Sequence, residues 1–135
     1  MDIFQKVKEL NLPIGSYVVF GGGPMSARGI KEAHDIDILT TPEIYEKFKK
    51  EGWEEKTASS GSNFLIKDDY ELFRDWNFSF ANYNPDPQKV IAEADIIDGV
   101  AFASLDEVRR WKSAFAREKD LVDIKLIDDF LAKQL

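Results

Sequence analysis

The chain has 135 residues, of which 44% are hydrophobic and 32% are charged, and its formal net charge at pH 7 is −7. This length predicts a single domain over residues 1–135 that buries a sizeable core without the help of disulfides or structural metal ions. The sequence contains no cysteine, which excludes a disulfide framework and a zinc–thiolate site. The negative charge argues against extended nucleic-acid binding, because a sequence-independent grip on phosphates depends on Lys and Arg.

Membrane insertion and export are not expected from this sequence. It has no run of about 18 apolar residues, the length that a transmembrane helix needs. The N-terminal segment MDIFQKVKEL contains an acid and no long apolar stretch, unlike a signal peptide. We therefore expect a cytoplasmic protein with no membrane partner.

Periodicity and turn residues predict helices and strands in mixed order. The first half is expected to hold, in chain order, a helix over 2–10, a strand over 16–20, a helix beginning at Pro24, a strand over 33–39 and a helix from Pro42 to the stop at Gly52. The second half is expected to hold a hairpin of 63–67 and 70–76 turning at Asp68-Asp69, a loop over 82–88, a short strand within 95–103, and helices beginning at Ser104 and about Arg117. This order predicts an α+β or small α/β-sandwich fold, with a small mixed sheet packed with helices and a C-terminal helical pair.

Two acids interrupt a strand that otherwise reads as core. Side chains alternate along a strand, so Asp35 and Asp37 would share one face while Ile36 and Ile38 share the other. Two carboxylates held so close repel each other, and a divalent cation with a preference for oxygen ligands, Mg²⁺ or Mn²⁺, would relieve the repulsion. The alternative is an edge strand with a solvated polar face, which needs no metal.

The glycine triplet Gly21–Gly23, followed by Pro24, predicts a strand, a tight turn and a helix start. Glycine allows the backbone to approach a ligand closely, and a helix start offers unpaired N–H groups to an anion. Ser26 and Arg28 would add a hydroxyl and a guanidinium to phosphate oxygens. The alternative is a plain connection, since the triplet is neither a Walker motif nor a GxGxxG fingerprint.

Together, these two motifs carry a family resemblance. Gly22-Gly23, eleven intervening residues and then Asp35-Ile36-Asp37-Ile38 resemble the signature of the nucleotidyltransferase superfamily typified by DNA polymerase beta. The segment Tyr70-Glu71-Leu72 fits the family's third carboxylate, which lies on a later strand. The C-terminal segment WKSAFAREKDLVDIKLIDDFL is similar to the terminal helices of small bacterial nucleotidyltransferase-like proteins.

The resemblance implies a nucleotidyltransferase fold and a metal-dependent reaction. A nucleoside monophosphate would move from a nucleoside triphosphate, such as ATP, to a hydroxyl acceptor, with release of pyrophosphate. The implied catalytic and metal-binding residues, with Mg²⁺ or Mn²⁺ as cofactor, are Asp35, Asp37 and Glu71. The implied nucleotide-binding residues are Gly22, Gly23, Ser26, Arg28 and Lys119.

Several alternatives remain open at the level of sequence. Asp75 competes with Glu71 as the third carboxylate, because both fall on one face of the same predicted strand. Lys112 competes with Lys119 as the residue that neutralises the triphosphate, whereas His34 is expected to face away from Asp35 and to be structural.

The acceptor is also open: a small molecule, a protein or an RNA end. A chain of this size has little room for an acceptor domain, which favours a homodimer or a protein partner that completes the acceptor site. The alternative function is a non-catalytic nucleotide-binding or antitoxin-like regulatory module that keeps the fold.

Overall fold

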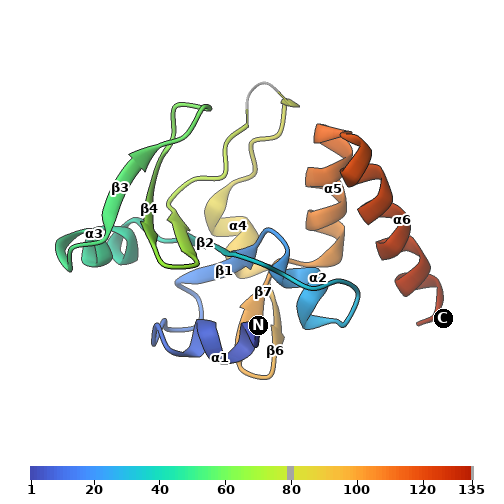
Figure 1. Cartoon of the computed structure of the whole chain (residues 1–135), viewed down its shortest axis with the longest axis horizontal. Coiled ribbons are helices and arrows are strands. Elements are labelled where there is room, and N and C mark those ends of the chain that lie inside the picture. Colours follow the sequence, from blue (N-terminus) through green and yellow to red (C-terminus); the bar gives the residue numbers. More distant parts are fainter. Residues whose placement is uncertain (79–80, 135) are drawn as a thin grey trace.

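The structure is a computed structural model that describes residues 1–78 and 81–134. Its centre is a mixed seven-stranded sheet in the order β3-β4-β5-β2-β1-β7-β6, with helices on both faces (Figure 1). The strands are β1 (Tyr17–Phe20), β2 (Ile36–Thr40), β3 (Glu54–Thr57), β4 (Asn63–Lys67), β5 (Tyr70–Phe73), β6 (Asp95–Ile97) and β7 (Val100–Phe102). The helices are α1 (Ile3–Lys8), α2 (Gly23–Ala27), α3 (Pro42–Lys50), α4 (Pro87–Ala92), α5 (Leu105–Phe115) and α6 (Glu118–Ala132).

Two hydrophobic cores lie on opposite faces of the sheet. The alternation of β1 sends Tyr17 and Val19 into one core, which also holds buried residues of α1 and α3. Val18 and Phe20 enter the other core, which is covered by α4, α5 and α6. Because both faces are covered at the centre of the sheet, β1 is buried along its whole length. Polar side chains on these central strands therefore stand out as candidates for a function.

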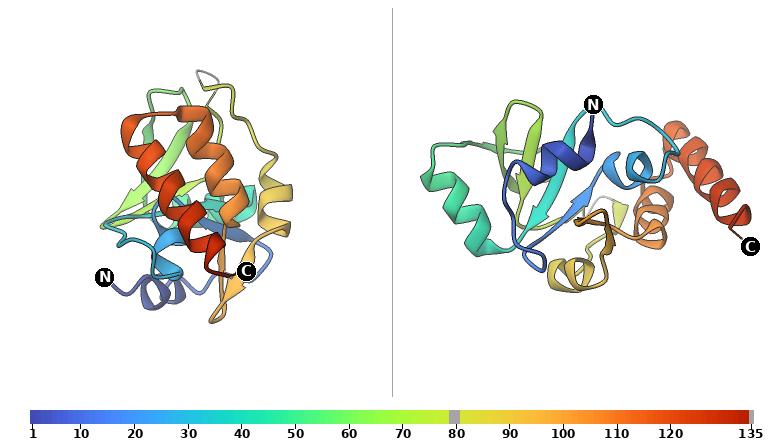
Figure 2. Two further views of the ribbon diagram at one scale, coloured as in Figure 1. Left: turned by 90° about the vertical axis from the view of Figure 1, so that its right-hand side faces the viewer. Right: turned by 90° about the horizontal axis from the view of Figure 1, so that it is seen from below.

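The C-terminal helices α5 and α6 lie side by side and run in opposite directions (Figures 1 and 2). Ala116, at φ 51°, and Arg117 connect them. This arrangement confirms the expected C-terminal helical pair and, with the mixed sheet, the α+β fold class. No helix in the described ranges combines the length and the apolar character needed to cross a bilayer.

The structure differs from the expected elements in three places. Strand β3 was not anticipated, because its sequence, EEKT, has no apolar alternation and it is held by pairing with β4. Helix α4 begins inside the expected loop at Pro87, where the Asp86 carboxylate caps it by accepting from the backbone N–H of Gln88. Residues 95–103 form a hairpin of two strands rather than one.

Helix α6 buries both apolar and acidic side chains. Ile127 is fully buried, whereas Leu121 is 56% exposed. Nearer the start of the helix, the buried positions are Asp120 and Asp123, which form ion pairs with Lys112 of α5. These ion pairs, together with Ile127, hold this face of the helix against the protein.

Candidate active site

Three carboxylates converge at the centre of the sheet. Asp37 lies on β2 and is directly opposite Glu71 on the parallel strand β5. Asp35 lies one residue before β2 begins. One ligand oxygen from each of the three residues lies within 4.8 Å of the others. We call Asp35, Asp37 and Glu71 the carboxylate trio.

Asp37 is electrostatically strained in the absence of a cation. Its pKa is raised from 3.8 to about 8, chiefly by burial, and also by a hydrogen bond with Glu71 and by the negative charges of Glu71 and Asp35. Its Oδ1 atom is buried and has no hydrogen-bond partner among the described residues. An orphaned acceptor beside two further carboxylates fits a hard divalent cation, which prefers oxygen ligands.

Gly21 is the glycine that allows the turn after β1 to pass this close to the trio. It has a φ of 63°, and a Cβ atom at this position would collide with the Asp37 carboxylate. Gly22 is exposed and lines the adjacent cleft. Gly23 is buried without a positive φ, and a Cβ there would lie 2.5 Å from Val19 Cγ1. Gly23 is therefore a packing position, while the close approach to the site belongs to Gly21.

A cleft of about 360 Å³ opens beside Asp35 and Asp37. Its walls come from the turn after β1, the segment before β2, the C-terminal half of α5 and the start of α6. The lining residues are Gly21, Gly22, Met25, Lys31, Glu32, Ala33, His34, Asp35, Asp37, Trp111, Lys112, Arg117, Lys119 and Asp123. His34 thus lies at the rim of the cleft rather than within a strand, because β2 begins only at Ile36.

Basic side chains form the wall of this cleft that faces the trio. Lys112 is only 7% exposed, and its Nζ lies 2.9 Å from Asp123 and 3.7 Å from Asp120. Arg117 also pairs with Asp120, at 2.6 Å, and Lys31 also pairs with Asp123, at 3.0 Å. The pKa values of Asp120 and Asp123 are lowered despite their burial, because hydrogen bonds and nearby positive charges favour the ionised carboxylates.

Lys119 differs from the other three cations of this wall. It lines the cleft from an exposed position and forms no ion pair with any described residue. We call Lys31, Lys112, Arg117 and Lys119 the basic wall. Within it, Lys112 is fixed by the protein and Lys119 is available to a ligand.

Two of the expected nucleotide-binding residues lie away from this cleft. The Arg28 guanidinium donates to the Pro24 carbonyl at 2.8 Å and pairs with Asp95 of β6. Burial lowers the pKa of Arg28, and the Asp95 carboxylate opposes that shift. Ser26 lies in α2, half-buried, and neither it nor Arg28 is among the described residues that line the cleft. Both expectations assumed that α2 continues toward the ligand, but Arg28 turns back toward β6.

The position of Asp75 separates it from the trio. It follows the end of β5, and its Oδ1 accepts a hydrogen bond from Ser62 Oγ at 2.7 Å. Glu71, in contrast, faces Asp37 across the β2–β5 register. The structure thus brings together the Asp35–Asp37–Glu71 set and leaves Asp75 outside it.

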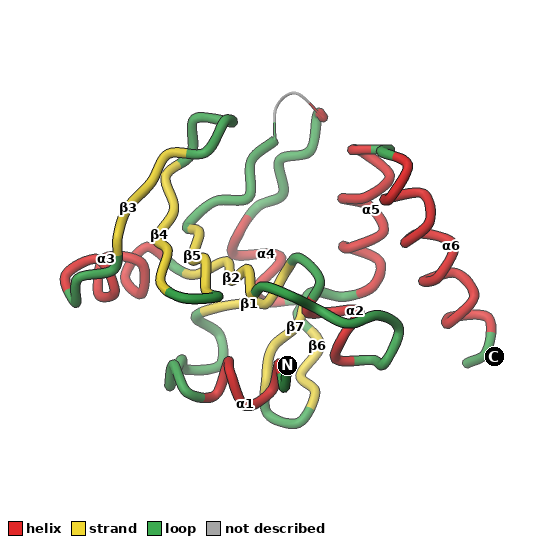
Figure 3. The backbone as a smooth tube through the Cα atoms, in the orientation of Figure 1, coloured by secondary structure: helices red, strands yellow, loops and turns green. Residues whose placement is uncertain are grey.

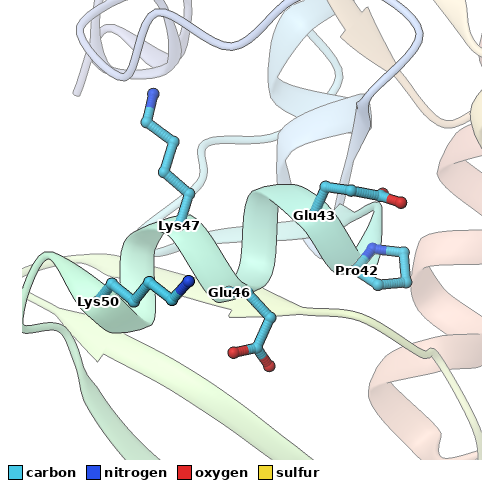
Figure 4. A pocket seen from close by; sticks show the side chains of 5 residues that line it. All are labelled: Pro42, Glu43, Glu46, Lys47 and Lys50. Atoms are coloured by element: carbon cyan, nitrogen blue, oxygen red, sulfur yellow. The ribbon is translucent and has the colours of Figure 1, made fainter.

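A hollow of about 560 Å³ runs along α3, remote from the trio. Figure 4 shows its lining side chains pointing in different directions, with Lys47 and Glu46 on opposite sides of the helix. The other lining residues are Pro42, Glu43 and Lys50. Because these groups do not converge, this surface has no chemistry to compare with that of the trio.

Comparison with known proteins supports the interpretation of the fold. No family model matches the chain, and no curated protein matches it. Among solved structures, the chain is similar to a crystal structure of ANT(2")-Ia in complex with adenylyl-2"-tobramycin. The TM-score is 0.53 and the sequence identity 20%, and the match covers 98% of this chain and 87% of that chain. The chain has a nucleotidyltransferase fold. The nucleotidyltransferase fold that the family resemblance implied is thereby confirmed.

Sequence reasoning missed two contributors to the site and left a third unassigned. Gly21 belongs to the glycine triplet that predicted a close approach, but only Gly22 and Gly23 were assigned to the site, although Gly21 directly follows the last residue of β1. Lys31 and Trp111 carry no motif, and only the tertiary structure brings them to the cleft.

Proposed function

We propose that this protein is a metal-dependent nucleotidyltransferase that moves a nucleoside monophosphate from a nucleoside triphosphate, with ATP as the first candidate, to a hydroxyl acceptor. The observation that carries the proposal is the carboxylate trio on a nucleotidyltransferase fold, with two of its members, Asp35 and Asp37, lining the same cleft as the basic wall. Negative ligands for a cation on one side and positive charges on the other are what a metal–triphosphate complex requires.

Asp35, Asp37 and Glu71 would hold Mg²⁺ or Mn²⁺. The fit rests on the unpartnered Asp37 Oδ1 atom and on the mutual repulsion that raises the pKa of Asp37. When bound, the cation would neutralise charge that develops on the phosphate oxygens. Glu71 would also accept the proton of an acceptor hydroxyl, since it lies directly beside Asp37. It is not among the described residues that line the cleft.

The basic wall would bind the phosphates that leave. Lys112 is held by Asp120 and Asp123, so its charge is oriented before any ligand arrives. Preorganised charge of this kind stabilises a leaving pyrophosphate without further rearrangement. Lys119, which is exposed at the same wall, would add a flexible contact. The exposed Gly22 would present its backbone to the phosphates from the opposite side.

The test is a transfer assay with α-labelled nucleotides. The protein is incubated with labelled ATP, Mg²⁺ or Mn²⁺, and a cell extract that supplies small molecules, proteins and RNA ends. We expect label on an acceptor with the wild type and at most about 1% of that signal with Glu71→Gln, since losing a proton acceptor costs two orders of magnitude or more. Metal-dependent nucleotide binding without any transfer would overturn the enzyme and leave a nucleotide-binding module.

A further inference from the structure

The carboxylates belong to a row of side chains that continues toward the β3 edge of the sheet. Beyond the Asp37–Glu71 pair, Glu71 is opposite Ile66 of β4. Ile66 is in turn opposite Glu54 of β3. Directly opposite residues on neighbouring strands point to the same face of the sheet. Ile66 therefore projects beside Glu71, one strand farther from Asp37.

A parallel row lies two residues along the strands and on the same face. Phe73 of β5 is opposite Phe64 of β4, and their rings stack with centroids 5.4 Å apart. Phe73 also packs against the second core. Phe64 and Ile66 are half-buried and belong to neither core of the described chain. Among the described residues, these two side chains therefore extend the apolar surface beyond the cores, with Phe64 joined to the second core only through its stacking on Phe73.

One end of this surface is closed by a polar contact. Ser62, just before β4, donates to Asp75, just after β5. The surface consequently extends from this hydrogen bond, past the stacked Phe64 and Phe73, to Ile66 and Glu71. Its open end is the carboxylate trio.

The trio lies between this surface and the basic wall. In Figure 1, α5 and α6 lie at one end of the molecule and β3 and β4 at the other, with β1 and β2 between them. In an in-line displacement, the attacking and leaving oxygens lie on opposite sides of the phosphorus. A pyrophosphate that leaves along the basic wall therefore requires an acceptor oxygen that arrives from the Glu71 side.

We propose that Phe64, Ile66 and Phe73 form the binding platform for the acceptor, and that the acceptor is a hydroxyl compound with an apolar or aromatic ring. This inference rests on the proposed function. Stacking and apolar contact are what Phe64 and Ile66 offer. The charges beside the platform are mixed, because Glu71 and Glu54 flank Ile66 in its row and Lys56 is opposite Phe64 on β3.

The reaction on this platform balances with the groups already named. The acceptor oxygen forms a bond to the α-phosphorus, and its proton passes to the Glu71 carboxylate. The bond between the α-phosphorus and the bridging oxygen breaks, and pyrophosphate leaves with the electron pair toward the basic wall.

A binding measurement tests the platform independently of catalysis. In protein with ¹³C-labelled isoleucine methyl groups, and with ATP and Ca²⁺ present to slow turnover, 4-nitrophenyl β-glucoside and other neutral aryl glycosides serve as ring probes and tobramycin as the polycation. We expect the ring probes to shift the Ile66 methyl resonance and to leave that of Ile44, on the remote helix α3, unchanged. A shift of Ile66 by tobramycin alone, or no shift by any ring probe, would overturn the acceptor class.

Substitutions then separate the platform from the transfer reaction. Phe64→Ser and Ile66→Ser should raise the KM for the acceptor that receives the label about tenfold or more, which is the scale of one lost apolar contact. The Kd for the nucleotide should not change. Ile44→Ser is the control, since Ile44 is half-buried against the first core. Equal transfer by wild type, Phe64→Ser and Ile66→Ser would overturn the platform and leave the transferase intact. If the ring probes shifted the Ile66 resonance but neither the wild type nor any variant transferred label, the transferase alone would be overturned.

Discussion

The two sides of the carboxylate trio are built in different ways. On the α5–α6 side, the cleft is walled by charges, and Lys112 is fixed by two buried acids. On the β4–β5 side, the surface is apolar, and Phe64 and Ile66 lie outside both cores. Under the proposed function, the charged side would hold the phosphates, whereas the apolar side is a sheet face that would bind the acceptor. The trio would then separate the donor from the acceptor.

The largest effect should come from the residue at the boundary of the two sides. Glu71→Gln keeps the size of the side chain and removes its ability to accept a proton, so transfer should fall roughly a hundredfold or more. Nucleotide affinity should stay within about threefold, because Asp35 and Asp37 remain. The measurement is single-turnover transfer together with calorimetric nucleotide binding.

Asp75→Asn is the matched control for this substitution, because Asp75 only accepts a hydrogen bond from Ser62. Its transfer rate should stay close to that of the wild type. If Asp75→Asn lowered the transfer rate and Glu71→Gln left it unchanged, the third acid would have been wrongly assigned.

The next effect concerns the stability of the charged side. Lys112→Met keeps the apolar stem but leaves two buried acids without their shared cation, and breaking a buried pair costs about 3 kcal/mol. Lys31 and Arg117 still contact these acids, which places the loss at the lower end of the usual range. Urea unfolding measures the change in the free energy of unfolding.

Lys119→Met provides the comparison on the same wall. Because Lys119 is exposed, the free energy of unfolding should not change, while nucleotide affinity should fall a few-fold. If Lys112→Met were as stable as the wild type, the ion pairs of Lys112 would not organise this side.

A smaller effect should come from the turn that closes onto the trio. Gly21→Ala requires a non-glycine residue at φ 63° and places a methyl group against the Asp37 carboxylate. The backbone alone costs about 1–2 kcal/mol, and nucleotide binding that depends on Mg²⁺ should weaken as Asp37 is displaced. Differential scanning calorimetry and nucleotide titration measure the two effects.

Gly29→Ala is the control for the turn, since Gly29 has a similar φ of 71° and a Cβ there would meet no described atom within 4 Å. It should lose a similar amount of stability and retain nucleotide binding that depends on Mg²⁺. Equal nucleotide binding by Gly21→Ala and Gly29→Ala would show that the approach to Asp37 does not matter.

The smallest predicted effect is a pH dependence of stability. The pKa of Asp37 is raised from 3.8 to about 8 in the folded protein. Between these two values the folded state holds a proton that the unfolded chain has released, so without metal this group makes the protein less stable as the pH rises toward about 8. The Tm should be lower near pH 8.5 than near pH 6, and Asp37→Asn should reduce the difference. Mg²⁺ should raise the Tm more at the higher pH. An identical pH dependence of the Tm for wild type and Asp37→Asn would contradict the raised pKa.

The sequence predicted the centre of the site better than its surroundings. Alternation along a strand is a local property, so the convergence of Asp35 and Asp37 could be inferred from their spacing, although β2 begins only at Ile36 and the expected strand over 33–39 began too early. The pairing of Glu71 with Asp37 is a register between distant strands, and only the family resemblance suggested it. The spacing of the glycines could not show that Gly21 passes closest to Asp37 while a Cβ at Gly23 would meet Val19, because backbone φ and tertiary packing decide this.

Charge placement was predicted less well for a physical reason. The burial of Asp120 and Asp123 depends on Lys112 of another helix, so the sequence of α6 alone did not mark these acids as buried. Arg28 was expected near phosphates, but its partner Asp95 lies far along the chain. The sheet order had the same limit at β3, whose sequence gives no strand pattern without β4.

The central claim is that the carboxylate trio binds nucleotide through a divalent cation, and calorimetry of ATP binding tests it most directly. Wild type and Asp35→Asn/Asp37→Asn are titrated with ATP in the presence of Mg²⁺, with Mn²⁺ as a second cation, and in the presence of a chelator. We predict that the wild type binds ATP only with the cation, and that the double variant loses the cation dependence while it stays folded, because apolar residues hold β2. Equal ATP affinity of the two proteins, with or without the cation, would contradict the account.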